Sequence, residues 1–350
     1  MGIIRRLSLV SGALFIITAS LFCSTALADA DAGSSAPPQE EIQYLTASQL
    51  AEEENLTAIL WVQRSAEFRG LSYQAYNLAT MAVDKAVTQR RKEEKDRRKT
   101  KENSTEQQNH FLPLAVILDI DDTIACHAPL EAYYTEHPEA KADYNAWKQW
   151  ISSHRLLLPG AADFLKYADS KGVQVFYVTG RGPQDRRITE DFLQKAGLPF
   201  PDGFHLMMND GSGGKMNHFA KLARRYDIIC YLGDNIADFP IGASRDENPV
   251  IYKKDFADNK SGAPETDMQS GKQKNGMPLD IQAMLKRDKN ATRNRIIDAH
   301  KQSFGTAFIL LPNPMYGDWE YNLAQKFRRL PAEQRIALRK AALKSFEFDK

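Results

Sequence analysis

The segment LAVILDIDDTIA, from Leu114 to Ala125, constrains the fold more than any other part of the chain. Five consecutive apolar residues lead directly into Asp119, and a second carboxylate follows at Asp121. An unbroken apolar run of this kind is typical of a parallel strand that is covered on both faces. Open α/β sheets bind their ligands at the C-terminal ends of such strands. Two carboxylates so close together repel each other unless a cation joins them, so the segment indicates a site for magnesium-assisted phosphoryl transfer.

Apolar segments that are typical of strands alternate with helical patterns through the middle of the chain. The predicted strands cover residues 114–120, 173–178, 204–208, 228–232 and 306–311. Helices are expected between them, at 161–170, 185–196 and 216–226. Alternating elements of these lengths predict a doubly wound parallel sheet of the α/β class. The core of this sheet domain is expected at about 112–252 and 304–312.

Further helical patterns flank this core. We expect helices in residues 46–87, where Gly70 divides the pattern in two, in the insertion at 125–158, and in the tail at 320–346. These segments are expected to form a smaller α-helical part beside the sheet. Two other stretches are polar: 88–110 is predicted to be a solvated helix end with a mobile linker, and 253–280 a mobile surface insertion.

The first 28 residues have the pattern of an export signal. Two arginines precede an apolar stretch, and residues 26–28, ALA, form a small-x-small cleavage sequence. The mature chain is expected to begin near Asp29, with a disordered spacer over 29–45. Two alternatives remain open, an uncleaved membrane anchor and lipidation of Cys23. The protein is therefore predicted to be exported and periplasmic, or outer-membrane-associated if Cys23 is lipidated.

Composition restricts the function classes. The formal net charge is +1, which gives no general attraction for nucleic acid, so a nucleic-acid polymer is not an expected partner. Without the signal, the chain keeps Cys126 and Cys230. Their predicted places, a loop above the sheet and the middle of a strand, favour two reduced thiols over a disulfide. Function must therefore come from a local site.

Polar and charged residues follow the predicted strands or open the next helix. The strands of a doubly wound sheet end at one crevice, so these residues are expected to converge there. They supply carboxylates for a cation and for nucleophilic attack, a hydroxyl and an ammonium group. Phosphoryl transfer needs this set because its catalysis depends on positioning and on neutralising negative charge. The candidate residues are Asp119, Asp121, Thr179, Lys215, Asp234 and Asp238.

The order of these residues resembles a known family. DIDDT, VTG, a single lysine and GDNIAD are similar to the four motifs of the haloacid dehalogenase superfamily. The flanking segments AILWVQRSAEFRGLSYQAYNLA and FGTAFILLPNPMYGDWE resemble the bacterial class C acid phosphatases (subfamily IIIB), and the likeness spans Leu50 to Phe346. The resemblance implies a Rossmann-like sheet with strand order 5-4-1-2-3 and a Mg²⁺-dependent phosphomonoesterase. It also implies nucleoside 5′-monophosphates as substrates, and it makes a homodimer plausible.

Carried over to this sequence, the resemblance implies catalytic roles. Asp119 would attack phosphorus in line and become an aspartyl phosphate. Asp121 would protonate the departing alkoxide and then accept a proton from the hydrolytic water. Thr179 and Lys215 would hold phosphate oxygens.

The resemblance also implies a metal site and a substrate clamp. Mg²⁺ would be bound by the Asp119 carboxylate, the Asp121 backbone carbonyl and Asp234. Asp238 would support the metal through its waters. An aromatic pair that stacks on the nucleobase is implied at Trp147 and Tyr316.

Other interpretations remain open for several residues and for the function. Trp150 and Trp319 are rivals of the two clamp residues, because large aromatic side chains are usually buried for packing. Asp122 is left outside the catalytic set, as a hydrogen-bond acceptor or a helix cap. The alternative functions are a phosphotransferase that uses the same acids and a surface binding protein without turnover. Three histidines show no metal-ligand spacing and are expected to be structural or surface residues: His127, His154 and His218.

Overall fold

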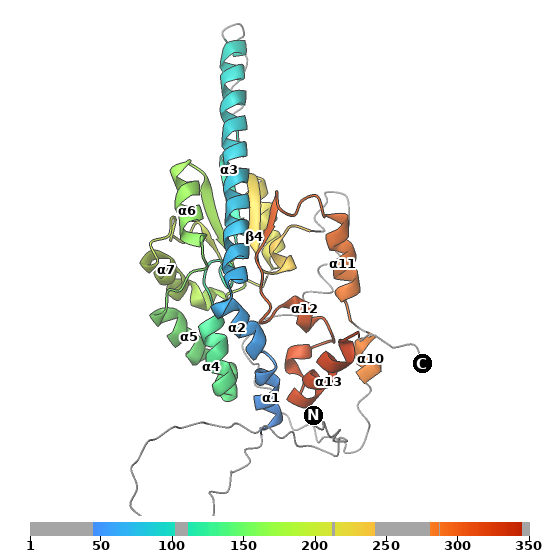
Figure 1. The fold of residues 1–350 in the computed structure, drawn as a ribbon. Helices are drawn as coiled ribbons and strands as arrows, with labels where there is room; N and C mark the ends of the chain where they lie inside the picture. The colour runs from blue at the N-terminus through green and yellow to red at the C-terminus, as the bar shows by residue number, and fades with distance from the viewer. Residues whose placement is uncertain (1–44, 102–110, 212–213, 242–280, 287, 345–350) are drawn as a thin grey trace, which may run out of the picture.

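A five-stranded parallel sheet forms the centre of the protein (Figure 1). The computed structural model describes residues 45–101, 111–211, 214–241, 281–286 and 288–344. The strand order is β3-β2-β1-β4-β5, which confirms the predicted order and the α/β class. The strands are β1 (Leu114–Leu118), β2 (Gln174–Val178), β3 (Leu206–Met207), β4 (Asp227–Gly233) and β5 (Phe308–Leu310).

Strand β1 lies in the middle of the sheet, and its register aligns the strand ends. Leu118 is opposite Tyr177 of β2 on one side and Leu232 of β4 on the other. Asp119, Thr179 and Asp234 come within two residues of these aligned positions. The residues that follow the three central strands therefore emerge at one edge of the sheet, where α/β proteins bind their ligands.

Helices cover both faces of the sheet. One face packs against α3 (Ala66–Lys101), α6 (Ala161–Ser170) and α7 (Arg186–Lys195) in the largest apolar cluster. The opposite face packs against α8 (Lys215–Ala223) and α11 (Asn290–Ala299) in a second cluster. Strand side chains alternate between these two clusters, and both are apolar, which explains why the strands appear as unbroken apolar runs in the sequence.

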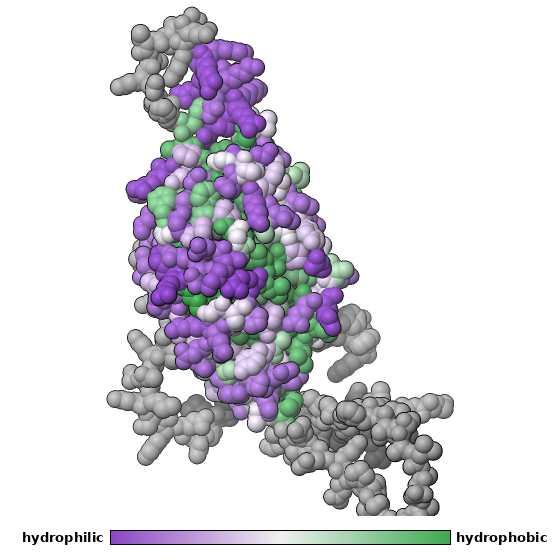
Figure 2. Space-filling view, turned by 90° about the vertical axis from the view of Figure 1, so that its left-hand side faces the viewer, coloured by the Kyte–Doolittle hydropathy of each residue, from purple (hydrophilic) through white to green (hydrophobic). Residues whose placement is uncertain are grey.

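The N-terminal helical flank differs from our expectation. It divides after α1 (Ala47–Glu53) and after α2 (Leu56–Arg64), whereas α3 continues through Gly70. Helix α3 also continues to Lys101, so the helix end that was expected within residues 88–110 covers residues 88–101. Lysine, glutamate and arginine favour the helix in this stretch. The end of α3 projects beyond the sheet domain, and its surface is hydrophilic (Figures 1 and 2).

The remaining helices form the smaller part at the lower end of the molecule in Figure 1. Arg339 connects three of them, because it donates to Glu320, to Glu54 and to the carbonyl oxygen of Ala51. The described elements of this part, besides α1 and α2, are α4 (Ala128–Glu136), η1 (Pro138–Ala142), α5 (Tyr144–Ser153), α10 (Ile281–Leu285), α12 (Asp318–Tyr321), η4 (Phe327–Arg329) and α13 (Ala332–Ala342).

Several predictions concern segments outside the described residues. The signal sequence, the spacer up to residue 44 and the insertion at 253–280 all lie there. Among the helices that the structure describes, none combines the length and the apolar character needed to cross a bilayer. Cys126 and Cys230 are both buried and unpaired, as expected.

Helix α3 supports the loops next to the strand ends. The hydroxyl group of Tyr76 donates to the carbonyl oxygen of Thr123, just beyond β1. Ser72 Oγ donates to the carbonyl oxygen of Pro159 at 2.8 Å. The next residue, Gly160, has φ +88° and lies so close to α3 that an added Cβ would be 3.1 Å from Cδ2 of Tyr76. The turn before α6 therefore needs glycine for both conformation and space.

We expect Gly160→Ala to lower the free energy of unfolding by about 2 kcal/mol, because it adds backbone strain and overpacks the contact with α3. Urea denaturation measures this change. Gly172→Ala is the matched control: its φ is +74°, but an added Cβ meets no atom within 4 Å. Equal losses in the two variants would show that the contact with Tyr76 does not constrain the turn.

Candidate active site

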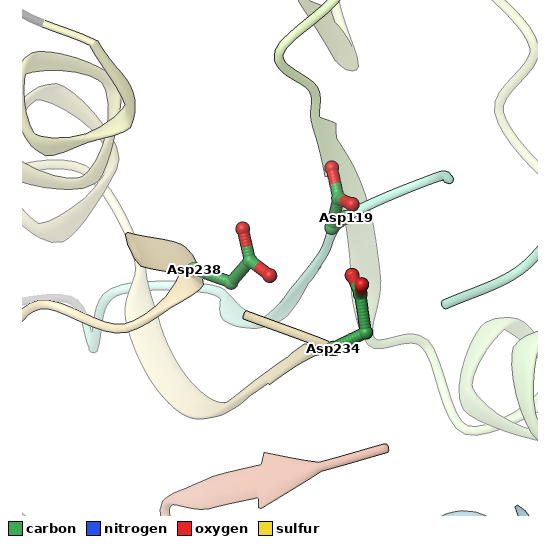
Figure 3. Close-up of side chains that lie close together, drawn as sticks. All are labelled: Asp119, Asp234 and Asp238. Carbon is green, nitrogen blue, oxygen red and sulfur yellow. The ribbon is translucent and has the colours of Figure 1, made fainter. Parts of the chain in front are cut away.

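Three aspartates meet at the C-terminal edge of the sheet. Asp119 follows β1, and its backbone N–H donates to the carbonyl oxygen of Leu232 at 3.0 Å. Asp234 follows β4, and Asp238 ends the short helix η3 (Ile236–Asp238). One carboxylate oxygen from each aspartate lies within 4.8 Å of the others, and Figure 3 shows the three side chains around one space. Asp238 therefore lies as close to the cluster as the two aspartates that we predicted as direct metal ligands.

Lys215 brings a positive charge into this cluster from the first residue of α8. Its ammonium group donates to the Asp119 carboxylate and to Oδ1 of Asp238, the latter at 2.6 Å. The Asp119 and Asp238 carboxylates raise the pKa of Lys215 although burial opposes this, so the side chain is charged. The structure thus brings Lys215 to the strand ends, as the sequence predicted.

Burial, together with the neighbouring carboxylates, raises the pKa of Asp119 and of Asp234. Burial raises the pKa of Asp119 to about 7; Lys215 opposes this shift, and Asp238 and Asp121 add to it. Burial also raises the pKa of Asp234 well above its usual value, followed by the effects of Asp238 and Asp119. Such shifts mark a site with an excess of buried negative charge.

A divalent cation fits this site. Three carboxylates and one ammonium group leave two formal negative charges, which one divalent cation balances. Carboxylate oxygens are the ligands that hard divalent cations prefer. Asp234 is also held in place, because Asn313 Nδ2 donates to its Oδ2 at 2.8 Å and Thr123 Oγ1 to its Oδ1 at 3.4 Å.

Asp121 points toward a different partner. Arg181 Nη2 lies 2.5 Å from its Oδ1, and Arg181 Nε lies 3.2 and 3.1 Å from Oδ1 and Oδ2. Burial favours a higher pKa for Asp121, but the charges of Arg181 and His127 outweigh burial and lower this pKa to about 2. Thr179 is fully buried, and its hydroxyl oxygen accepts the backbone N–H of Arg181 at 3.2 Å.

Arg181 also contacts the predicted substrate clamp. Its guanidinium carbon lies 5.2 Å from the ring centroid of Trp147, within the range of a cation–π contact. Trp147 stacks on Tyr144 with 5.8 Å between ring centroids. Trp150 is buried and Trp147 is only half-buried, so Trp147 is the tryptophan of this pair that offers more ring surface to a ligand.

Tyr316, the second predicted clamp residue, is hydrogen-bonded to Asp122 in the loop after β1. Its hydroxyl group donates to Oδ2 of Asp122, and Oδ1 of Asp122 accepts the backbone N–H of His127 at 2.8 Å. Asp122 is therefore a hydrogen-bond acceptor, one of the two interpretations left open. Among the ring contacts of the described residues, none joins Tyr316 to Trp147. The rival Trp319 is 48% exposed.

The structure adds residues that the sequence analysis missed. Arg181 is only 5% exposed and is bonded to Asp121, and Asn313 is bonded to Asp234. Each lies three positions after the last residue of a strand, β2 or β5. Extending the search to the first turn after every strand would have found both. His127, which we expected to be structural or at the surface, is buried with Nε2 3.2 Å from Oδ1 of Asp121.

This fold and site define a class of protein. A parallel α/β sheet with a buried carboxylate after its central strand, and with a lysine and further acids around it, is an arrangement for phosphoryl transfer.

Comparison with known proteins identifies the family. Residues 35–319 match the model of the HAD superfamily, subfamily IIIB (acid phosphatase), so the chain belongs to this family and is a phosphomonoesterase.

Solved structures agree with this assignment. The chain is similar to the class C acid phosphatase from Bacillus anthracis, with 26% sequence identity and a TM-score of 0.60 over 85% of this chain and 100% of the other. It is also similar to the B. anthracis class C acid phosphatase with tungstate bound, with 25% identity and a TM-score of 0.61 over the same shares of the two chains. The predicted family resemblance is confirmed.

The geometry predicts that Gly233 is needed for the aspartate cluster. A Cβ at this last residue of β4 would lie 2.2 Å from Cβ of Asp238, so Asp238 must move away from Lys215. We expect Gly233→Ala to lower kcat/KM for a phosphate ester by about tenfold or more, as misplaced catalytic groups do. Gly70→Ala is the control, because an added Cβ there meets nothing within 4 Å. A Gly233→Ala variant with normal turnover would show that Asp238 need not stay in place.

Proposed function

We propose that this acid phosphatase is an exported, Mg²⁺-dependent enzyme that hydrolyses nucleoside 5′-monophosphates through an aspartyl-phosphate intermediate. The observation that supports this most is the meeting of Asp119, Asp234 and Asp238 with Lys215 at the end of the central strands. Export is supported by the signal-like sequence of residues 1–28, and a periplasmic place, or an outer-membrane one if Cys23 is lipidated, is proposed with it.

In the first step, a carboxylate oxygen of Asp119 attacks phosphorus and the ester oxygen leaves. Lys215, with its ammonium group on the Asp119 carboxylate, would also reach the transferring phosphoryl oxygens. The backbone around Thr179 and its hydroxyl group would hold another phosphate oxygen. These groups stabilise the negative charge that spreads over the phosphoryl oxygens in the transition state.

Mg²⁺ would be held by Asp119, Asp234 and the backbone carbonyl of Asp121, with Asp238 close by; when bound, it neutralises charge on the phosphoryl group. The net formal charge of the aspartate cluster with Lys215 fits such a divalent cation.

Asp121 is proposed to act first as acid and then as base. Its pairing with Arg181 favours the carboxylate, which is the form that accepts a proton from the hydrolytic water in the second step. The acid form is needed in the first step. A phosphate dianion that enters the site raises the pKa of a neighbouring carboxyl group, so substrate binding itself favours protonation of Asp121.

Trp147 supports nucleotides as the substrate class. It is half-buried at the edge of the site and contacts Arg181, which holds Asp121. An aromatic ring in this place provides a stacking surface that accepts any base.

A similar B. anthracis enzyme has been solved with tungstate bound, and tungstate is a tetrahedral oxyanion like phosphate. This likeness supports a phosphate ester as the substrate of the present chain.

We expect Asp119→Asn to lower turnover by several orders of magnitude, because removal of the nucleophile leaves only binding and electrostatic effects. Steady-state hydrolysis of a phosphate ester measures the loss, and circular dichroism checks the fold. Asp163→Asn, an exposed position in α6, is the matched control and should keep wild-type turnover. Unchanged turnover in Asp119→Asn would eliminate the proposed mechanism.

A substrate panel tests the cofactor and the substrate class together. Hydrolysis of nucleoside 5′-monophosphates, sugar phosphates and aryl phosphates is compared with and without EDTA. We expect EDTA to abolish activity on all of them, added Mg²⁺ to restore it, and nucleotides to be preferred. Activity that survives EDTA would refute the metal requirement.

The variant Trp147→Leu is tested on the same panel of substrates. Loss of a stacking surface should reduce kcat/KM for nucleotides by about tenfold relative to a sugar phosphate. The ratio of the two substrates removes any common effect through Arg181. An unchanged ratio would remove Trp147 from the nucleotide site.

A further inference from the structure

His127 lies beside the proposed acid and base, and the mechanism above gives it no role. It is only 4% exposed, and its Nε2 lies 3.2 Å from Oδ1 of Asp121. Its Nδ1 lies 3.6 Å from Oδ2 of Asp122, and neither ring contact has full hydrogen-bond geometry. A buried polar group without a hydrogen bond costs about 1–3 kcal/mol, so a position of this kind needs a reason.

The histidine ring is fixed on two sides. Its backbone N–H donates to Oδ1 of Asp122 at 2.8 Å, which holds the residue just before α4. Its ring packs against the buried ring of Trp150, with 4.7 Å between centroids. The imidazole is therefore held next to Asp121 by the loop after β1 and by helix α5.

The two carboxylate oxygens of Asp121 have different surroundings. Oδ1 is close to three nitrogens: Arg181 Nη2 at 2.5 Å, Arg181 Nε at 3.2 Å and His127 Nε2 at 3.2 Å. Oδ2 has Arg181 Nε at 3.1 Å. Because Oδ1 faces three nitrogens and Oδ2 faces one, Oδ2 is the oxygen that keeps capacity to exchange a proton with a substrate.

We propose that His127 is a positioning residue for leaving-group protonation, which together with Arg181 fixes Oδ1 of Asp121 and leaves Oδ2 for the departing oxygen. This inference rests on the proposed acid role of Asp121. As the P–O bond breaks, its electron pair stays on the ester oxygen, which takes the proton from Oδ2. Later, Oδ2 takes a proton from the water that attacks the aspartyl phosphate.

Leaving-group dependence separates this role from a purely structural one. The parameter kcat/KM reports the steps up to departure of the alcohol, so it isolates protonation of the leaving group. An alkyl phosphate needs that proton, whereas 4-nitrophenolate leaves without it. Two variants are compared: His127→Phe keeps a ring against Trp150 but has no donor, and His127→Gln keeps an N–H donor on a flexible chain.

We expect His127→Phe to lower kcat/KM for the alkyl phosphate by about 30-fold and for 4-nitrophenyl phosphate by about threefold or less, since general acid catalysis contributes about 10²–10⁴-fold. His127→Gln should recover most of the loss on the alkyl phosphate. Thermal unfolding verifies that both variants fold. Equal losses on the two substrates, or no loss, would overturn the proposal and leave His127 as a packing residue.

The variant Asp121→Asn shows whether a negative result concerns the role of His127 alone or the proposed acid role of Asp121. If Asp121 is the acid, Asp121→Asn also loses far more activity on the alkyl phosphate than on 4-nitrophenyl phosphate. A selective loss in Asp121→Asn without one in His127→Phe would reject only the role of His127. No selective loss in Asp121→Asn would reject the acid role of Asp121 itself.

Discussion

The pairing of β1 with β4 is the constraint on which the rest of the site depends. Ala115 is opposite Ile228, but Val116 is opposite Cys230, so β4 has one extra residue at this point. After this bulge Leu118 is opposite Leu232, and Asp119 and Asp234 follow at the same edge. A slip of one residue moves side chains to the other face of a sheet, so the bulge sets which residues of β4 reach the nucleophile.

Burial of the charges that this strand pairing brings together is unfavourable in free energy. Three carboxylates lie together, and Lys215 balances the charge of only one of them. Folding alone does not favour such a cluster, and sites of this kind persist where function requires a preorganised field. The packing around it is correspondingly strict: Gly233 has no space for a side chain beside Asp238, and Asn313 holds Asp234. The site is thus closely packed, and its net formal charge fits a divalent cation.

The features that depend on local sequence pattern, the strands and the acids after them, were predicted from the sequence. Buried strands appear as apolar runs, so the five strands were found, and the acids directly after them were found because they follow the runs. The strand order came from the family resemblance. Arg181 and Asn313 were missed because each lies three positions after the end of its strand, and nothing in the local pattern indicates their partners, Asp121 and Asp234, which are 60 and 79 positions away. Helix α3 was predicted to divide at Gly70, but packing of its Phe68 and Tyr76 in the core outweighs the cost of about 1 kcal/mol for one glycine.

Arg181 contacts both the proposed acid, Asp121, and the proposed stacking residue, Trp147, which belong to different segments of the sequence. One guanidinium group bonds to Asp121, donates to Thr189 Oγ1 at 3.1 Å, and lies against the ring of Trp147. Trp147 belongs to α5 in the insertion after β1, whereas Arg181 follows β2. The orientation of the proposed acid and the position of the proposed base-stacking ring therefore depend on one side chain. Because the guanidinium is planar and its donors are in a fixed arrangement, we expect movement of the Trp147 ring to change the geometry at Asp121, which would couple the proposed base stacking to the proposed proton transfer.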